Sequence, residues 1–192
     1  MSGKEKLEQY SIKQPGCIID VNGCLGDTKA REHFIADPDN RDWHGFFQAM
    51  LTDHPVDMVH RFTNALNDWP YYCHSLLITG APEKYRPMMV KWLETYQVKY
   101  NRLYMRPNGA YIKGYQFKKK LYEESIRHEY DIILALDDKQ EVANVWRDFG
   151  IPCWLVAECP YPRREMPETQ VSSRLTTRGN RMASRGRAPR PR

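Results

Sequence analysis

Residues 131–138 read DIILALDD and form the strongest β-strand signal in this chain. Five apolar residues follow one another at 132–136, without the polar alternation of a strand that is exposed on one face. Such a run is typical of a strand that is buried on both faces, as in a parallel sheet. A helix is predicted next, at 139–149, and Gly150 stands where its C-cap is expected.

Three more apolar runs indicate strands, and segments with helical spacing separate them. The strands are predicted at residues 16–20, 75–79 and 153–157, the second of them stopped by Gly80. Helices are predicted at 82–96, at 115–130, and in two stretches of 27–72, the second of which Pro55 opens. Strands that alternate with helices of this length predict an α/β fold, in which helices cover both faces of a parallel sheet.

The net charge of +5 is concentrated at one end of the chain. Residues 163–192 contain nine Arg and two Glu, a charge of +7, so the preceding residues sum to −2. The segment has almost no large apolar side chains to bury, which predicts a disordered, Arg-rich tail over 161–192. Arg interleaved with Ser and Gly suits the phosphate backbone of nucleic acid. The alternative is a solvated tail that only aids solubility or meets acidic proteins.

Residues 1–15 are predicted to be a flexible lead-in, which leaves 16–160 as the folded domain. No stretch approaches 18 consecutive apolar residues, so we expect no membrane partner. The polar first 14 residues lack a signal-peptide core, which predicts a cytoplasmic location. The five Cys form no C-x-x-C pair, which argues against a zinc cluster or a disulfide framework.

Polar side chains follow three of the predicted strands. The first strand ends in Asp20, the second in Thr79 and Gly80, and the third in Asp137 and Asp138. Ligands bind at the carboxyl ends of the strands of a parallel sheet, although such residues are also common in ordinary turns. Adjacent carboxylates repel each other, and a hard cation relieves that repulsion. The sequence therefore predicts a magnesium site.

A magnesium site next to an aspartate predicts phosphoryl chemistry. Asp20 can attack a phosphoryl group and become an aspartyl-phosphate, while the metal neutralises charge. The hydroxyl of Thr79 and the backbone amide of Gly80 are candidates for binding the transferred oxygens. Lys118 is the candidate for neutralising further charge, although a run of three Lys is also typical of a solvated helix face.

These residues resemble the motifs of a known family. Asp20-x-Asn22-Gly23-x-Leu25, Thr79-Gly80, Lys118 and Asp137-Asp138 occur in the order of the four motifs of the haloacid dehalogenase (HAD) superfamily. Over about residues 16–158 the chain is more closely similar to the phosphatase domain of bacteriophage-type polynucleotide kinase-phosphatases. The stretches that support this similarity are 77–86, 103–107 and 137–147.

The resemblance implies a Rossmann-like HAD fold with a small helical cap at about 27–72. It implies that Mg²⁺ is held by Asp20, by the backbone carbonyl of Asn22, and by Asp137 or Asp138. Arg31 occupies the position of a substrate-contacting arginine, and substrate binding is likewise expected of Gly80 and of Arg106. The implied activity is removal of a 3′-phosphate from nucleic-acid or nucleotide ends through phospho-Asp20, with Thr79 and Lys118 binding phosphate.

The chain departs from the family pattern at five positions. The family's general acid, two residues after the nucleophile, is Asn22 here, and an amide cannot transfer that proton. Loss of a general acid costs on the order of 10²–10⁴ in rate. A small hydroxyl residue is replaced by Cys24, an arginine by Ala81, an acid by Gly114, and a second arginine by Lys139.

Three explanations of Asn22 stay open: a decayed site, a substrate whose leaving group needs no protonation, and an engineered change. An engineered Asn22 does not account for Ala81 and Gly114, so natural divergence is favoured. The phosphatase hypothesis therefore has two alternatives. One is a catalytically impaired relative that binds nucleic acid, and the other is a phosphatase of free 5′-nucleotides.

Overall fold

The computed structural model describes residues 13–68 and 73–156. The chain divides into two compact units, Met1–Tyr161 and Pro162–Arg192, and all of the described residues belong to the first. Most of the predicted lead-in, and the predicted tail, lie outside the described residues. No helix in the described part of the chain is long and apolar enough to cross a membrane.

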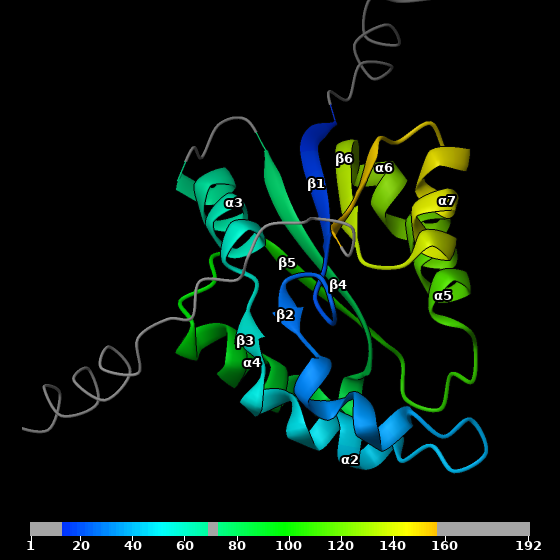
Figure 1. Ribbon diagram of the computed structural model, residues 1–192. Helices are drawn as coiled ribbons and strands as arrows, with labels where there is room; N and C mark the ends of the chain where they lie inside the picture. Colours follow the sequence, from blue (N-terminus) through cyan, green and yellow to red (C-terminus); the bar gives the residue numbers. More distant parts are fainter. Residues whose placement is uncertain (1–12, 69–72, 157–192) are drawn as a thin grey trace, which may run out of the picture. The chain divides into compact units, whose positions relative to one another are not determined.

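Five strands form one sheet in the order β5-β4-β1-β6-β7, and every neighbouring pair is parallel. The predicted parallel α/β sheet is therefore confirmed (Figure 1). The strands are β1 (Gln14–Asp20), β4 (His74–Pro82), β5 (Arg102–Arg106), β6 (Tyr130–Asp137) and β7 (Cys153–Leu155). Three boundaries differ most from the prediction: β1 begins two residues earlier, β4 continues through Gly80, and β7 ends already at Leu155.

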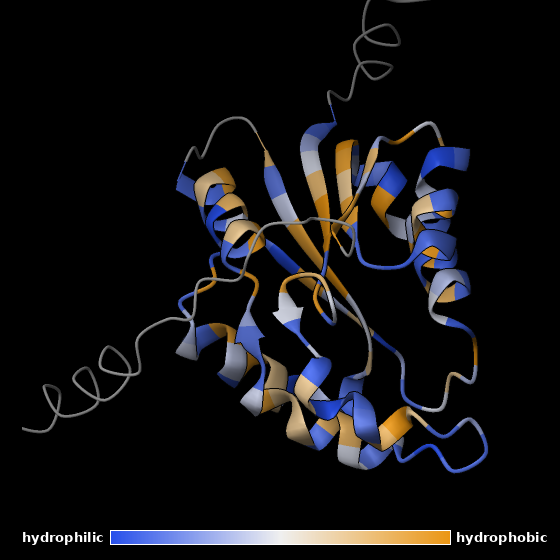
Figure 2. Cartoon of the chain, viewed as in Figure 1, coloured by the Kyte–Doolittle hydropathy of each residue, from blue (hydrophilic) through white to orange (hydrophobic). Residues whose placement is uncertain are grey.

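Helices cover both faces of this sheet, as predicted. One face carries α3 (Asp57–Asp68) and α4 (Arg86–Thr95), and the other carries α5 (Gly114–Leu121), α6 (Arg127–Glu129) and α7 (Gln140–Asp148). Ile19 belongs to the first apolar cluster and Ile18 to the second, because successive side chains of a strand point to opposite faces. The central strands are accordingly apolar, β6 most evidently (Figure 2).

The predicted helix 115–130 consists of three pieces. A π-helical turn (Tyr122–Ile126) separates α5 from α6, and the chain then enters β6 directly at Tyr130. Ile126 is fully buried in the turn, so the wider turn keeps an apolar side chain against the sheet. The predicted helix 139–149 agrees closely with α7, and Gly150 follows it with a φ of +77°.

The cap is shorter than the predicted 27–72. Two short antiparallel strands, β2 (Gly26–Asp27) and β3 (His54–Pro55), close the base of an insertion. The insertion holds a 3₁₀ helix (Lys29–Ile35), α2 (Trp43–Gln48) and a second 3₁₀ helix (Ala49–Thr52), and α2 lies beyond the carboxyl ends of the strands (Figure 1). The last predicted helix, α3, packs on the sheet instead, because its apolar side is buried there and its Asn67 Nδ2 donates to Ser75 Oγ of β4.

Candidate active site

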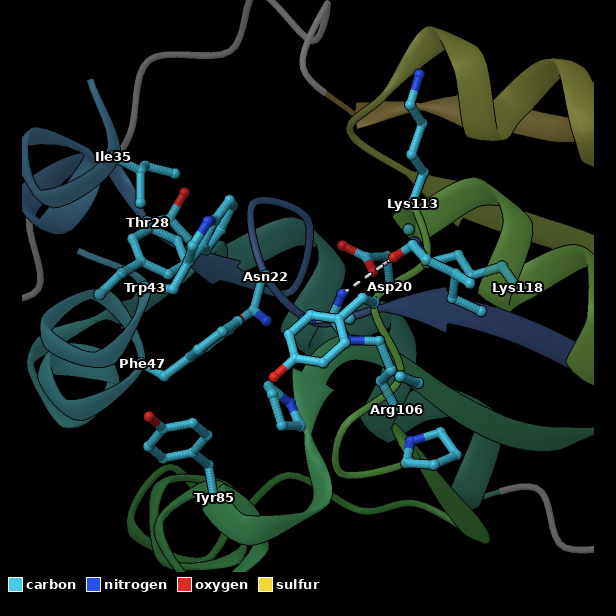
Figure 3. Close-up of a pocket in the computed structure, with 18 of the residues that line it drawn as sticks. Asp20, Asn22, Thr28, Ile35, Trp43, Phe47, Tyr85, Arg106, Lys113 and Lys118 are labelled. Atoms are coloured by element: carbon cyan, nitrogen blue, oxygen red, sulfur yellow. Dashed lines mark hydrogen bonds and ion pairs between the residues drawn. The ribbon is translucent and has the colours of Figure 1, made fainter. Parts of the chain in front are cut away.

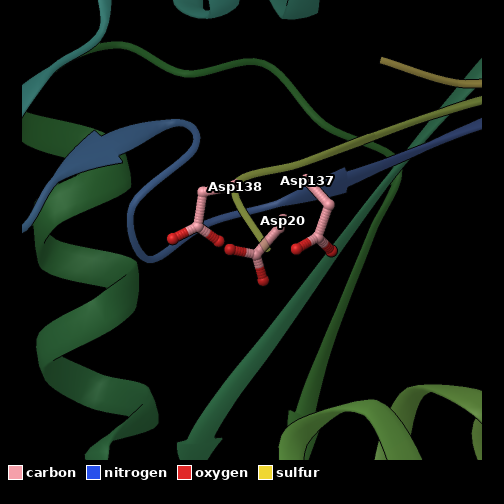
Figure 4. Close-up of side chains that lie close together, drawn as sticks. All are labelled: Asp20, Asp137 and Asp138. Carbon is pink, nitrogen blue, oxygen red and sulfur yellow. The ribbon is translucent and has the colours of Figure 1, made fainter. Parts of the chain in front are cut away.

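The carboxyl ends of β1 and β6 bring three carboxylates together. Ile19 pairs with Leu136 across the two strands, so Asp20 and Asp137 end neighbouring strands at the same edge. One carboxylate oxygen of each of Asp20, Asp137 and Asp138 lies within 4.8 Å of the others. Figure 4 shows the three side chains turned toward a common space. The structure therefore assembles the residues in which the sequence predicted a metal site.

Lys118 joins this carboxylate cluster from helix α5. Helix α5 packs against the sheet through Phe117 and carries the Lys118 ammonium, which is buried. Its Nζ donates to Asp20 Oδ1 and to Asp137 Oδ2, each at 2.6 Å. The run of three Lys made Lys118 weak evidence by itself, and its contacts now place it at the centre of the charged cluster.

Burial raises the pKa of Asp20 to about 7, and the neighbouring charges of Asp137 and Asp138 act in the same direction. The Lys118 ammonium acts against that rise. Burial likewise raises the pKa of Asp138, and its Oδ1 is buried without a hydrogen-bond partner among the described residues. The Lys118 ammonium thus binds two of the three carboxylates, the charge of Lys139 acts on the third, Asp138, and the buried Oδ1 of Asp138 is left unsatisfied among the described residues.

A magnesium ion fits these donors. Carboxylate oxygens are hard ligands of the kind that Mg²⁺ prefers, and a cation beside Asp138 would satisfy its buried oxygen. The turn after β1 is shaped to the same carboxylate. Gly23 has a φ of +94°, and a Cβ there would lie 2.2 Å from Asp138 Oδ2. Only glycine permits this approach of the turn to the cluster.

Asn22 is oriented by its neighbours. Its Oδ1 accepts from Arg31 Nη2 at 2.8 Å, and its Nδ2 donates to Thr79 Oγ1 at 2.7 Å. Thr79 is fully buried behind the cavity wall, and its Oγ1 also accepts from the backbone N–H of Ala81 at 3.1 Å. Asn22 therefore links the end of β1 with the middle of β4.

Arg31, which the resemblance predicts to be a substrate contact, is buried and does not line the cavity described below. The side chain has no exposed surface, and its guanidinium is paired with the buried carboxylate of Asp53, with an Nη2–Oδ2 distance of 2.6 Å. Its Nη1 donates to the backbone carbonyl of Phe46 at 2.9 Å. Sequence reasoning missed Asp53, because an ion pair across 22 residues of an irregular cap leaves no local pattern.

A cavity of about 660 Å³ opens over the carboxylates. Asp20, Asn22 and Lys118 line one side of it, and Trp43, Phe47 and Tyr85 line the other (Figure 3). The predicted substrate-binding residues Gly80 and Arg106 also line this cavity. Arg106 Nη1 donates to the carbonyl of Ile112 at 3.2 Å, and its Nε is buried without a partner among the described residues.

The other residues at which the chain departs from the family pattern lie either in the core or at the cavity. Ala81 is fully buried in the apolar cluster that contains Ile19, whereas Gly114 and Lys139 both line the cavity. Cys24 is also fully buried, and burial raises the pKa of its thiol. The Lys and Arg residues that line the cavity are Lys84, Arg106, Lys113, Lys118 and Lys139.

Residues 15–161 match the protein family described as the phosphatase domain of polynucleotide kinase PNKP. The chain belongs to this family. As a HAD-type phosphatase domain, it is a hydrolase of phosphate esters. The match spans all of the described strands and helices except the first residue of β1.

Among curated proteins, this phosphatase domain is similar to a putative bifunctional polynucleotide kinase/RNA ligase of Autographa californica nuclear polyhedrosis virus. The two are 29% identical over 123 residues, which are 62% of this chain and 17% of the viral protein. The chain therefore spans about a sixth of that relative.

Two solved structures share the fold of the domain. One is the structure of a Pnkp1/Rnl/Hen1 complex, with a TM-score of 0.65 and 24% identity over 77% of this chain and 47% of the matched chain. The other is the structure of the Pnkp1/Rnl/Hen1 RNA repair complex, with a TM-score of 0.65 and 26% identity, over 77% and 43% of the two chains. The chain thus covers less than half of either matched chain.

Proposed function

We propose that this domain is a magnesium-dependent phosphatase that removes a terminal phosphate, in particular a 3′-phosphate, from nucleotide or polynucleotide ends. The observation that carries the proposal is the placement of Asp20 on the floor of the cavity. There it is held by Lys118 and lies beside Asp137 and Asp138.

Asp20 is the proposed nucleophile. Lys118 holds its Oδ1, which fixes the carboxylate, and the side chain lines the cavity in which a phosphate would bind. Attack on phosphorus forms an aspartyl-phosphate and breaks the bond to the leaving oxygen. Magnesium, held by Asp20, the carbonyl of Asn22, and Asp137 or Asp138, would neutralise charge on the carboxylates and the phosphate. Water then attacks the phosphorus and returns Asp20 to its carboxylate form.

Asn22 determines the rates that we expect for both the formation and the hydrolysis of the aspartyl-phosphate. Its amide can donate a hydrogen bond but cannot transfer a proton to the leaving oxygen or take one from water. The leaving oxygen must draw its proton from solvent, and the attacking water receives no help from residue 22. We expect rates lower by about 10²–10⁴ than with a carboxylic acid there. The aspartyl-phosphate is consequently expected to persist.

The opposite wall of the cavity supports a nucleotide as the substrate. Trp43 stacks on Phe47, with ring centroids 5.9 Å apart and planes 24° apart, and 45% of its surface is exposed. Phe47 in turn contacts the ring of Tyr85 at 5.2 Å between centroids. A nucleobase can stack on such an aromatic wall while its phosphate lies near Lys118. The cavity volume of about 660 Å³ exceeds the need of a phosphate alone.

Phosphate release from three substrates tests this function. The substrates are a 3′-phosphorylated oligonucleotide, a 5′-nucleotide and an aryl phosphate, each with and without Mg²⁺. We expect magnesium-dependent release, fastest from the oligonucleotide. Preference for the 5′-nucleotide would favour the free-nucleotide alternative. Absence of release from all three would overturn the proposal.

The presence of Asn22 favours one second candidate, an impaired relative that only binds nucleic acid. The variant Asn22→Asp separates the two, because it should raise kcat if the rest of the site is intact. If Asn22→Asp releases no phosphate and Asp20→Asn leaves nucleic-acid binding unchanged, the binding candidate replaces the enzyme.

A further inference from the structure

Behind the proposed phosphate site lies a chain of four hydrogen-bonded side chains: Asp53, Arg31, Asn22 and Thr79. The end of this chain that is farther from the cavity is the ion pair of Arg31 and Asp53. Arg31 Nε lies 2.8 Å from Asp53 Oδ1, and Nη2 lies 2.6 Å from Oδ2, so the carboxylate is bound in a two-pronged geometry. The guanidinium carbon also lies 4.0 Å from the centre of the Phe46 ring. Both charged groups are buried.

The chemistry of arginine decides which way the Asn22 amide points. A guanidinium has only N–H donors, so the group that it contacts must be an acceptor. The Asn22 oxygen, 2.8 Å from Arg31 Nη2, therefore faces the arginine. Its NH₂ group is turned the other way and donates to Thr79 Oγ1 at 2.7 Å. An amide flipped by 180° would place donors against donors.

This orientation determines the direction of the Thr79 hydroxyl. Its oxygen accepts from Asn22 Nδ2 and from the backbone N–H of Ala81, which fills both acceptor positions. The hydroxyl hydrogen must therefore be donated to a third group. Thr79 has no exposed surface, and a buried donor without an acceptor is unfavourable. Thr79 itself does not line the cavity, but its neighbours Asn22 and Gly80 do, beside Asp20, and a phosphate oxygen bound against this wall would accept that hydrogen.

We propose that Arg31, held by Asp53, is a positioning residue that directs the Thr79 hydroxyl and the second N–H of Asn22 toward the substrate phosphate. This inference rests on the proposed function, because it needs a phosphate in the cavity. A carboxylate at position 22 would do the opposite: it would accept from Arg31 and would draw the Thr79 hydrogen to itself. Asn22 thus replaces a proton-transferring group with one that strengthens the hold on phosphate.

A double-mutant cycle measures this coupling. The readout is the dissociation constant of inorganic phosphate in the presence of Mg²⁺, by isothermal titration calorimetry on the full chain. We expect Thr79→Val to weaken binding about tenfold or more, the usual effect of a lost hydrogen bond to a charged group. We expect Thr79→Ser, which keeps the hydroxyl, to retain affinity. In the Asn22→Asp background, Thr79→Val should change affinity less than about twofold, since the hydroxyl no longer serves the phosphate.

An equal loss from Thr79→Val in both backgrounds would overturn the inference. The negative charge that Asn22→Asp adds is present in both members of its pair, so it cancels from the comparison. A chain that binds no phosphate at all would overturn the proposed function and this inference with it. A chain that binds phosphate with no coupling between residues 22 and 79 would overturn the inference alone.

The role of Arg31 is tested by removing the ion pair as a unit. A single change at Arg31 or Asp53 leaves a buried charge unpaired, whereas apolar replacement of both partners is often tolerated. In a folded Arg31→Leu/Asp53→Leu variant, the effect of Thr79→Val on phosphate affinity should fall well below tenfold. An undiminished effect would contradict the positioning role. The Asn22→Asp cycle keeps the ion pair intact, so it still decides whether residue 22 directs the Thr79 hydroxyl where the double variant fails to fold.

Discussion

Three carboxylates crowd together at the end of the sheet around one buried ammonium, that of Lys118, and this crowding makes cation binding depend on pH. In the metal-free protein, burial and the nearby Asp137 and Asp138 raise the pKa of Asp20 to about 7, well above the value of an exposed aspartate. Magnesium needs the deprotonated carboxylate, so protons and the metal compete for Asp20.

We therefore expect the magnesium affinity to fall as the pH drops below 7, by up to about tenfold per pH unit. The stability of the metal-free fold changes with pH in the opposite direction. Because the folded pKa of Asp20 lies above its unfolded value, the metal-free fold binds the extra proton and loses stability as the pH rises from about 4 to 7. Thermal melts with and without Mg²⁺ over this range measure both effects. A magnesium-induced shift that is independent of pH, or equally pH-dependent in Asp20→Asn, would contradict this account.

Residues of the candidate site could be predicted where they follow an apolar strand or belong to a family motif. Asp20, Asp137 and Asp138 follow apolar runs, and the parallel sheet brings the ends of such runs together. Arg31 was expected to contact substrate, whereas the structure buries it against Asp53, and its position in the sequence carries no information on that burial. Asp53 could not be found, since neither a motif nor a periodic pattern points to it.

At the scale of elements, the turn after β1 shows how backbone geometry serves the charged cluster. A Cβ on Gly23 would lie 2.2 Å from Asp138 Oδ2, so Gly23→Ala must displace that carboxylate or the turn. We expect the variant to lose magnesium affinity at least about tenfold, measured by calorimetry. Gly150→Ala is the matched control, because Gly150 also has a positive φ, +77°, but no atom within 4 Å of the added Cβ. Equal losses in the two variants would point to backbone strain alone.

Helix α2 supplies Trp43 and Phe47 of the aromatic wall, and the proposed function predicts that Trp43 contacts the base of the substrate. Trp43→Ala should lower kcat/KM for a 3′-phosphorylated oligonucleotide about tenfold, in line with the usual value of one stacked base. The same oligonucleotide with an abasic terminal nucleoside should show no such loss. Trp154→Ala is the control, since Trp154 is 58% exposed on β7 and does not line the cavity. Equal losses for both substrates would remove Trp43 from substrate recognition.

Elements were predicted best where long apolar runs or helical spacing mark them. Strand β5 was missed, because its apolar residues are few and stand between Arg102 and Arg106 at the edge of the sheet. Helix α3 was assigned to the cap because it lies in the same sequence interval. Its apolar side is compatible with either location, and only the packing against β4 decides between them.

At the scale of the whole molecule, the charge of the chain predicts a second contact with nucleic acid. Residues 163–192 hold nine Arg, whereas the rest of the chain is slightly acidic. If most of these Arg reach phosphates, the logarithm of the affinity should fall with the logarithm of the salt concentration with a slope of roughly −5. Deletion of 163–192 should flatten this slope in a filter-binding or anisotropy titration. An unchanged slope would remove the tail from nucleic-acid binding.

Phosphorylation of Asp20 itself tests the central claim most directly. The chain is mixed with a 3′-phosphorylated oligonucleotide and Mg²⁺, sampled over a time course long enough for the slowed first step, quenched in acid, digested at low pH, and examined by mass spectrometry. Because Asn22 cannot activate water, we predict that one phosphoryl group is found on the peptide that contains Asp20, and that Asp20→Asn abolishes both this adduct and phosphate release. Phosphate release that continues in Asp20→Asn, or that proceeds without any adduct on Asp20, would contradict the account.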